Sequence, residues 1–91
     1  MTRRSMRYRK RTYCSKLLLE RLLKNDYQNR VARAHEISSG YLSSIELGKT
    51  PATMELRAAL AEYYGLEPSD LFDGDGYSLE ARRTEALRRL R

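Results

Sequence analysis

Apolar residues recur along this chain at helical spacing, and no segment shows the strict alternation of a half-buried β-strand. The clearest pattern follows the i, i+3, i+4, i+7, i+8 spacing of an amphipathic helix and consists of Leu56, Ala59, Leu60, Tyr63 and Tyr64. Thr53 is a suitable N-cap for this helix, and Gly65 is a suitable C-cap. The sequence therefore predicts a helix between these two residues.

Two short helices are predicted before it, separated by a turn of three or four residues. The first spans about residues 27–34, with Val31 and Ala34 on its inner side, and the second spans about 39–47. Leu42 and Ile45 form the inner side of the second helix, and Ser38 is its expected N-cap. Gly48 and Pro51 then end it.

Helices are also predicted towards both ends of the chain. Ser15 is the expected cap of a helix that ends at residues 25–26 and whose apolar side is formed by Leu18, Leu19, Leu22 and Leu23. Pro68 begins a short helix that directs Leu71 and Phe72 inward, and a turn follows at residues 73–76. Ser78 opens a last, Arg-rich helix over about residues 79–90. The predicted fold class is all-α.

Composition adds limits to this picture. A length of 91 residues allows one domain, and the 41% apolar and 33% charged residues suit a globular chain. The longest apolar run, Ala58 to Ala61, is far too short to span a membrane. A single cysteine, Cys14, forms no intrachain disulfide, so we expect a cytoplasmic protein.

The net charge of +6 is unevenly distributed. Residues 1–24 carry net +8, residues 25–76 carry net −5, and residues 77–91 carry net +3. We expect a basic flexible arm at residues 1–12, a globular domain at 13–76 and an Arg-rich helix at 77–91. For this last helix two alternatives stay open: it dimerises or binds a protein partner, or it is solvated or folds back on its own domain. The basic residues of the arm are Arg3, Arg4, Arg7, Arg9, Lys10 and Arg11.

Enzyme chemistry finds little support in the sequence. His35 and Cys14 are distant in sequence and make a weak catalytic pair, and His35 is expected to be a half-buried core residue. The acidic turn at residues 73–76 lacks the twelfth-position Glu of a calcium loop, because Thr84 stands there. No metal-ligand spacing or phosphate-binding loop is present, so no cofactor and no metal are expected.

The most informative stretch is residues 28–51, which read QNRVARAHEISSGYLSSIELGKTP. The informative positions are Gln28, Val31, Ala32, Ile37, Ser38, Leu42, Ser43, Ile45, Glu46, Gly48 and Pro51. Their spacing resembles the helix-turn-helix of the Cro/phage-repressor (XRE) family. The segment after it is similar to the fourth and fifth helices of that family at Leu56, Ala59, Leu60, Gly65, Leu66, Leu71 and Phe72. The resemblance covers about residues 15–72 and implies a lambda-repressor-like five-helix domain, here with the basic arm and the extra C-terminal helix.

The resemblance implies a sequence-specific regulator, a repressor, that binds double-stranded DNA as a homodimer and is therefore associated with the nucleoid. The third helix would enter the major groove, and the arm would lie on the backbone or in the minor groove. The implied base-facing positions are Ser38, Ser39, Gly40, Ser43 and Ser44. The implied backbone contacts are Gln28, Asn29, Tyr41, Lys49 and Thr50. Arg21 and Glu46 match a structural salt bridge of the family.

Several positions depart from the family pattern. The base-facing positions hold Ser and Gly where Gln, Asn or Arg usually pair with purines, so shape readout or the arm would supply part of the specificity. His35 and Asp26 replace residues that are usually apolar, and Glu36 replaces a usual Gly. Two alternatives stay open: an antitoxin-type interaction module that represses its own promoter, and RNA binding by the arm.

Overall fold

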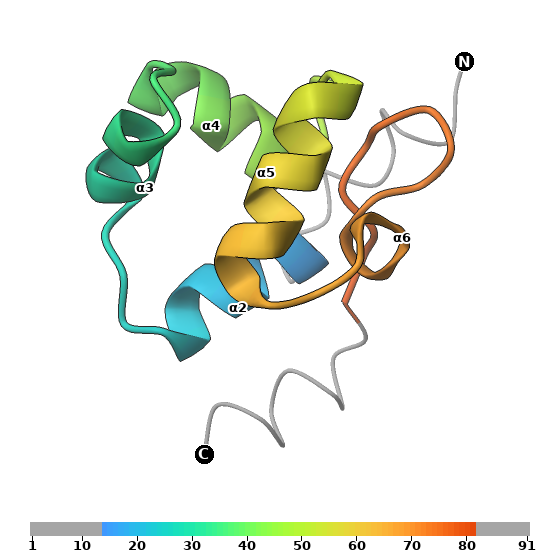
Figure 1. The fold of residues 1–91 in the computed structure, drawn as a ribbon, viewed down its shortest axis with the longest axis horizontal. Coiled ribbons are helices and arrows are strands. Elements are labelled where there is room, and N and C mark those ends of the chain that lie inside the picture. The colour runs from blue at the N-terminus through green and yellow to red at the C-terminus, as the bar shows by residue number, and fades with distance from the viewer. Residues whose placement is uncertain (1–13, 82–91) are drawn as a thin grey trace.

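The structure, a computed structural model, describes residues 14–81, and this part of the chain is mostly helical (Figure 1). Its helices are α2 (Lys16–Leu23), α3 (Gln28–Ala34), α4 (Ser39–Glu46), α5 (Met54–Tyr64) and α6 (Pro68–Leu71). Between residues 14 and 81 no strand forms, and two isolated antiparallel bridges are present. The coarse prediction of an all-α chain is confirmed for these residues. The expected arm and most of the expected last helix lie outside them.

Helix boundaries follow the capping residues closely. The side-chain oxygens of Ser15, Ser38 and Thr53 each accept a hydrogen bond from the backbone N–H three residues later, as N-caps do. Gly65 ends α5 with a φ of 72°, in the left-handed region that glycine adopts without strain. Pro68 occupies the first turn of α6, where its missing N–H costs nothing. These sequence predictions are confirmed.

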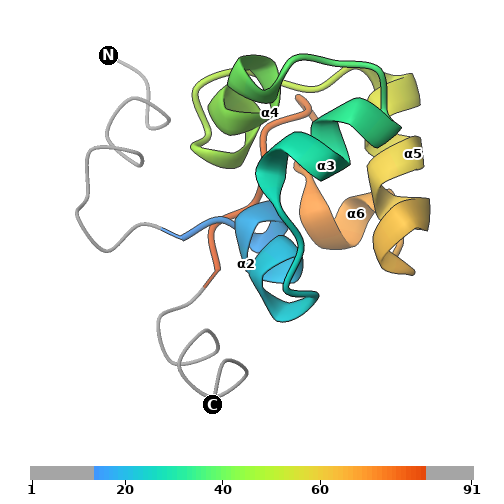
Figure 2. The ribbon, with the colours of Figure 1, turned by 90° about the vertical axis from the view of Figure 1, so that its left-hand side faces the viewer.

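One main core joins all five helices. Its fully buried side chains include Leu17 of α2, Val31 of α3, Ile45 of α4, Leu60 of α5 and Leu71 of α6. Burying each such side chain contributes about 1.5–3 kcal/mol. Figure 2 shows α3 and α4 together on one side of the fold, with α2 and α6 below them and α5 along one edge.

The inner face of α2 differs from the prediction. Leu17 is completely buried, whereas Leu22, which was expected inside, is 42% exposed and Leu18 is half-buried. The reason is that α2 is covered from two sides: Leu17 joins the main core, and Leu19 packs with Ala81 in a second cluster. A helix between two clusters does not show a single apolar stripe.

The inner side of α3 differs from the prediction at one position. Ala34 was expected inside and is exposed, whereas Val31 is fully buried, as predicted, and Ala32 of the helix-turn-helix pattern is 2% exposed beside it. Because α3 and α4 lie in direct contact, the two neighbouring residues Val31 and Ala32 both face the core.

The predicted helix start at Ser78 is wrong. Residues 77–81 are not helical, and Ser78 is fully buried with its Oγ accepting a hydrogen bond from the N–H of Leu17 at 3.2 Å. The N–H of Lys16 donates to the carbonyl of Leu79 at 2.6 Å, and the N–H of Ala81 donates to the carbonyl of Cys14 at 2.7 Å. The first amides of a helix lack intrahelical acceptors, and this segment supplies acceptors to α2. Residues 77–81 are therefore part of the packed domain.

Within residues 14–81, no helix is long and apolar enough to cross a membrane.

Candidate nucleic-acid interface

The α3–turn–α4 unit is the part of the fold for which the sequence predicts a function. α3 ends at Ala34 with His35 as its C-cap, Glu36 and Ile37 form the turn, and Ser38 caps α4. Glu36 adopts a φ of 58°, which is a strained conformation for a residue with a side chain and explains why glycine suits this position. Ile37 is half-buried and packs against the main core, so it fixes the angle between the two helices.

The outer face of α4 presents small, uncharged side chains. Ser38, Ser39 and Gly40 are exposed, and Ser43 and Ser44 are half-buried. The chain has no charged residue from 37 to 45. This face can therefore approach a polyanion without charge repulsion, and its hydroxyls can both donate and accept hydrogen bonds.

The residues expected to contact a nucleic-acid backbone differ in how exposed they are. Asn29 and Lys49 are exposed, Thr50 is half-buried, and Tyr41 is half-buried against the main core. Gln28 is half-buried, and its Nε2 donates to Oε1 of Glu46 at 2.9 Å. Sequence reasoning missed this internal role of Gln28, and spacing alone gives no signal for a contact between two different helices.

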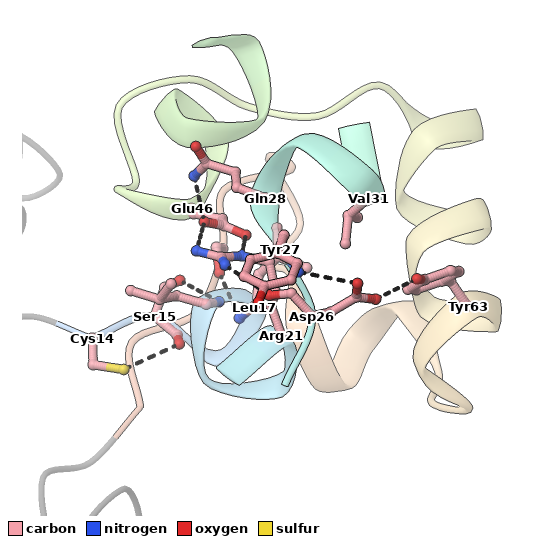
Figure 3. A network of polar contacts seen from close by, with 12 residues as sticks. Cys14, Ser15, Leu17, Arg21, Asp26, Tyr27, Gln28, Val31, Glu46 and Tyr63 are labelled. Carbon is pink, nitrogen blue, oxygen red and sulfur yellow. Dashed lines mark hydrogen bonds and ion pairs between the residues drawn. The ribbon is translucent and has the colours of Figure 1, made fainter. Parts of the chain in front are cut away.

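The ion pair that the resemblance implies is present in the structure. Arg21 donates from Nε to Oε2 of Glu46 at 2.8 Å and from Nη2 to Oε1 at 3.1 Å (Figure 3). The Glu46 side chain is 2% exposed and the Arg21 side chain 13%. The hydrogen bond to Glu46 raises the pKa of Arg21 above its usual range, despite the opposing effect of burial. The Arg21 guanidinium therefore stays charged at neutral pH and bonded to Glu46.

This network holds three helices in register. Arg21 comes from α2, Gln28 from α3 and Glu46 from the last turn of α4. Arg21 also donates from Nη1 to the carbonyl of Asp26 at 3.1 Å, which fixes the connection between α2 and α3. Charge-assisted bidentate bonds are directional as well as strong. The network thus sets the direction in which α4 presents its outer face.

Tyr64 of α5 is the one residue among those described whose buried side-chain oxygen has no hydrogen-bond partner. Tyr64 is 7% exposed. Burial raises the pKa of Tyr64 well above its usual value, and the negative charge of Glu46 raises it further. The phenol is therefore neutral throughout the physiological range.

A second polar cluster links the α2–α3 connection to α5. The Asp26 side chain is 6% exposed and accepts hydrogen bonds from the N–H of Tyr27 at 3.1 Å and from the hydroxyl of Tyr63 (Figure 3). The hydrogen bond to this carboxylate raises the pKa of Tyr63. His35 packs edge-on against Tyr63, with ring centroids 5.2 Å apart, and its Nδ1 lies 2.8 Å from the carbonyl oxygen of Val31. His35 is half-buried, as the sequence predicts. The polar residue at position 26 is therefore accommodated by specific partners.

Metal ligation has no support in residues 14–81, where no group of three or more His, Cys, Asp or Glu could hold an ion. Comparison of the chain with family models, with curated proteins and with solved structures gives no match. The interface is therefore interpreted from its own geometry.

Proposed function

We propose that this chain is a sequence-specific regulator, a repressor, that binds double-stranded DNA with a lambda-repressor-like helix-turn-helix. The observation that carries the proposal is the orientation of α4. The buried Arg21–Glu46–Gln28 network anchors its inner side, and its outer side presents an uncharged face of small residues.

The dimensions of α4 suit the major groove of B-DNA. With its side chains an α-helix is about 10–12 Å in diameter and the groove is about 12 Å wide, so the 8 residues of α4 can lie in it. The hydroxyls of the exposed Ser39 and the half-buried Ser43 would meet base edges, and Lys49 after the helix would meet a phosphate. A serine hydroxyl can bond to several different bases. α4 would therefore determine where the domain sits along the DNA more than how tightly it binds.

The charge of the domain explains why the basic arm is needed. Residues 14–81 hold seven basic and eleven acidic side chains, a net charge of −4, whereas residues 1–13 hold six basic side chains and no acid. A body of this sign is repelled by phosphates at long range. We therefore assign most of the electrostatic affinity to the arm.

Selection of random double-stranded DNA by the full chain, followed by footprinting, tests this function. We expect a specific sequence with contacts in the major groove, and half-sites about 34 Å apart if two copies bind. Ser39→Glu and Ser43→Glu should abolish specific binding, because each places a carboxylate on the outer face of α4. Ser69→Glu is the matched control, because Ser69 is also exposed and lies on α6.

Three outcomes would contradict the proposal. The first is an absence of enrichment from the random pool at physiological salt, and the second is equal effects of the substitutions on α4 and α6. The third is binding only together with a co-purifying protein, which would instead support the antitoxin-type interaction module.

A further inference from the structure

A groove lies between the α3–α4 turn and the first half of α5. It has a volume of about 500 Å³, and its apolar lining includes Ile37, Tyr41, Leu56 and Ala59. Two exposed carboxylates, Glu36 and Glu55, also line it. No Lys or Arg lines it within the described part of the chain.

Exposed apolar surface continues beside the groove. Met54, between Thr53 and Glu55, exposes 77% of its surface, more than the other exposed large apolar residues of the described part. An apolar groove with a negative edge is complementary to a segment that carries aliphatic side chains flanked by positive charges.

The chain itself contains a segment of that chemistry. Residues 82–91 read RRTEALRRLR, with Ala86, Leu87 and Leu90 among five arginines and one glutamate. We propose that the groove of one copy binds residues 82–91 of a second copy. The leucines would enter the apolar groove, and the arginines beside them would pair with Glu36 and Glu55.

The place where the segment leaves the domain favours a second copy over the same chain. The N–H of Ala81 donates a hydrogen bond to the carbonyl of Cys14 beside the start of α2. Figures 2 and 3 show this edge on the side of the fold away from α5. Leu87 is six residues beyond Ala81, a span of at most about 22 Å. A segment that leaves the domain at this edge would have to pass around the fold to reach its own groove.

Exchange of the segment in both directions would give a closed, two-fold dimer. Tyr41, at the groove, and Ser39 and Ser43, on the outer face of α4, are two positions apart and therefore point to opposite sides of that helix. The outer face of α4 thus stays accessible in such a dimer. The dimer would therefore leave the base-facing positions of α4 free and would cover Tyr41, one of the expected backbone contacts.

Charge-reversal variants of the full chain test the inference, with the dimer dissociation constant measured by sedimentation equilibrium. We expect a concentration-dependent dimer whose dissociation constant rises at least about tenfold in the groove variant E36K/E55K and in the tail variant R88E/R89E. Mixing the two variants should restore a dimer, because each groove then meets a segment of opposite charge. The matched control is E62K/E80K, which changes the net charge equally at two exposed acids outside the groove.

Circular dichroism of each variant separates loss of the dimer from loss of the fold. The inference is overturned by a wild-type chain that stays monomeric at every concentration tested. A dimer that E36K/E55K weakens no more than E62K/E80K does would also overturn it, as would two folded variants that fail to associate when mixed. Each of these results would leave the DNA-binding proposal standing, because footprinting measures that function separately.

Discussion

Arg21 and Glu46 form a bidentate ion pair between α2 and α4, with donor–acceptor distances of 2.8 and 3.1 Å. The carboxylate is almost completely buried and also accepts a hydrogen bond from Gln28. The pair lies on the inner side of α4, the helix that we propose for DNA recognition. Its disruption therefore has consequences for both stability and the direction of α4.

Removal of one partner should destabilise the domain strongly. Arg21→Ala leaves a buried carboxylate without its countercharge, so we expect a loss of about 3–5 kcal/mol in the free energy of unfolding, measured by urea denaturation. Arg30→Ala is the control, because Arg30 lies 3.5 Å from Asp26 but its side chain is 71% exposed. That exposed pair should contribute less than about 1 kcal/mol. Equal losses in the two variants would argue against the buried network.

Tyr64→Phe should stabilise the protein or leave it unchanged at neutral pH, because it removes a buried hydroxyl without a partner. The expected gain is about 1 kcal/mol. The variant should also resist alkali better. The folded pKa of Tyr64 is raised, so its contribution to stability is complete below its unfolded pKa of about 10 and is lost as the pH rises towards the folded value.

Urea denaturation of both proteins between pH 7 and 11.5 provides the measurement for Tyr64. The stability of the wild type should fall more steeply above pH 10 than that of the Phe variant. Tyr63 also has a raised pKa, so part of the fall should remain in the variant. Parallel curves would show that Tyr64 is not the buried titrating group.

Glu36→Gly should raise the stability, because the residue has a φ of 58° in the turn before α4. Relief of this strain is worth about 1 kcal/mol, less the extra conformational freedom that glycine has in the unfolded chain. Glu36→Ala is the matched control, since alanine loses the same carboxylate and keeps the strained backbone. Thermal unfolding should rank Gly above both Glu and Ala. An Ala variant as stable as the Gly variant would attribute the effect to charge.

Truncation should locate the true end of the folded domain. A chain ending at Gly76 lacks the Ser78 and Leu79 acceptors for the first amides of α2 and lacks Ala81 against Leu19. We expect it to unfold at a much lower temperature than a chain ending at Ala81. The longer chain should retain most of the wild-type melting temperature. Similar melting of the two truncated chains would show that residues 77–81 contribute little.

Local signals in the sequence predicted much of this fold, because caps and helix-ending glycines act within a few residues. Thr53 and Gly65 give the boundaries of α5 directly. The covered faces of α2 depend instead on Ala81, more than sixty positions away, and no periodicity within the helix reports that neighbour. Ser78 is an ordinary N-cap residue by its type, and only its long-range bond to Leu17 gives it another role.

The candidate interface could be predicted to a different extent. The pairing of Arg21 with Glu46 came from a family resemblance, since 25 positions separate the two residues. The bond between Gln28 and Glu46 had no local signal, because it depends on how α3 and α4 cross. The groove beside α5 is likewise formed by residues that precede and follow α4 in the sequence. Its two carboxylates are brought together by the fold alone.

Deletion of residues 1–11 should weaken the proposed DNA binding and reduce its salt dependence, because both depend on the number of phosphate contacts. The deleted segment holds six basic side chains, and the domain that remains between residues 14 and 81 has a net charge of −4. Each phosphate contact that is lost should lower the slope of log K against log salt concentration by about 0.9. Binding of the selected DNA would be titrated from about 50 to 200 mM salt, the range over which several phosphate contacts change affinity strongly. Replacement of Arg3, Arg4, Arg7 and Arg9 by Ser at full length is the matched control, because it removes charge without shortening the chain. An unchanged slope in both variants would place the phosphate contacts outside the arm, on the folded domain or on the Arg-rich residues 82–91.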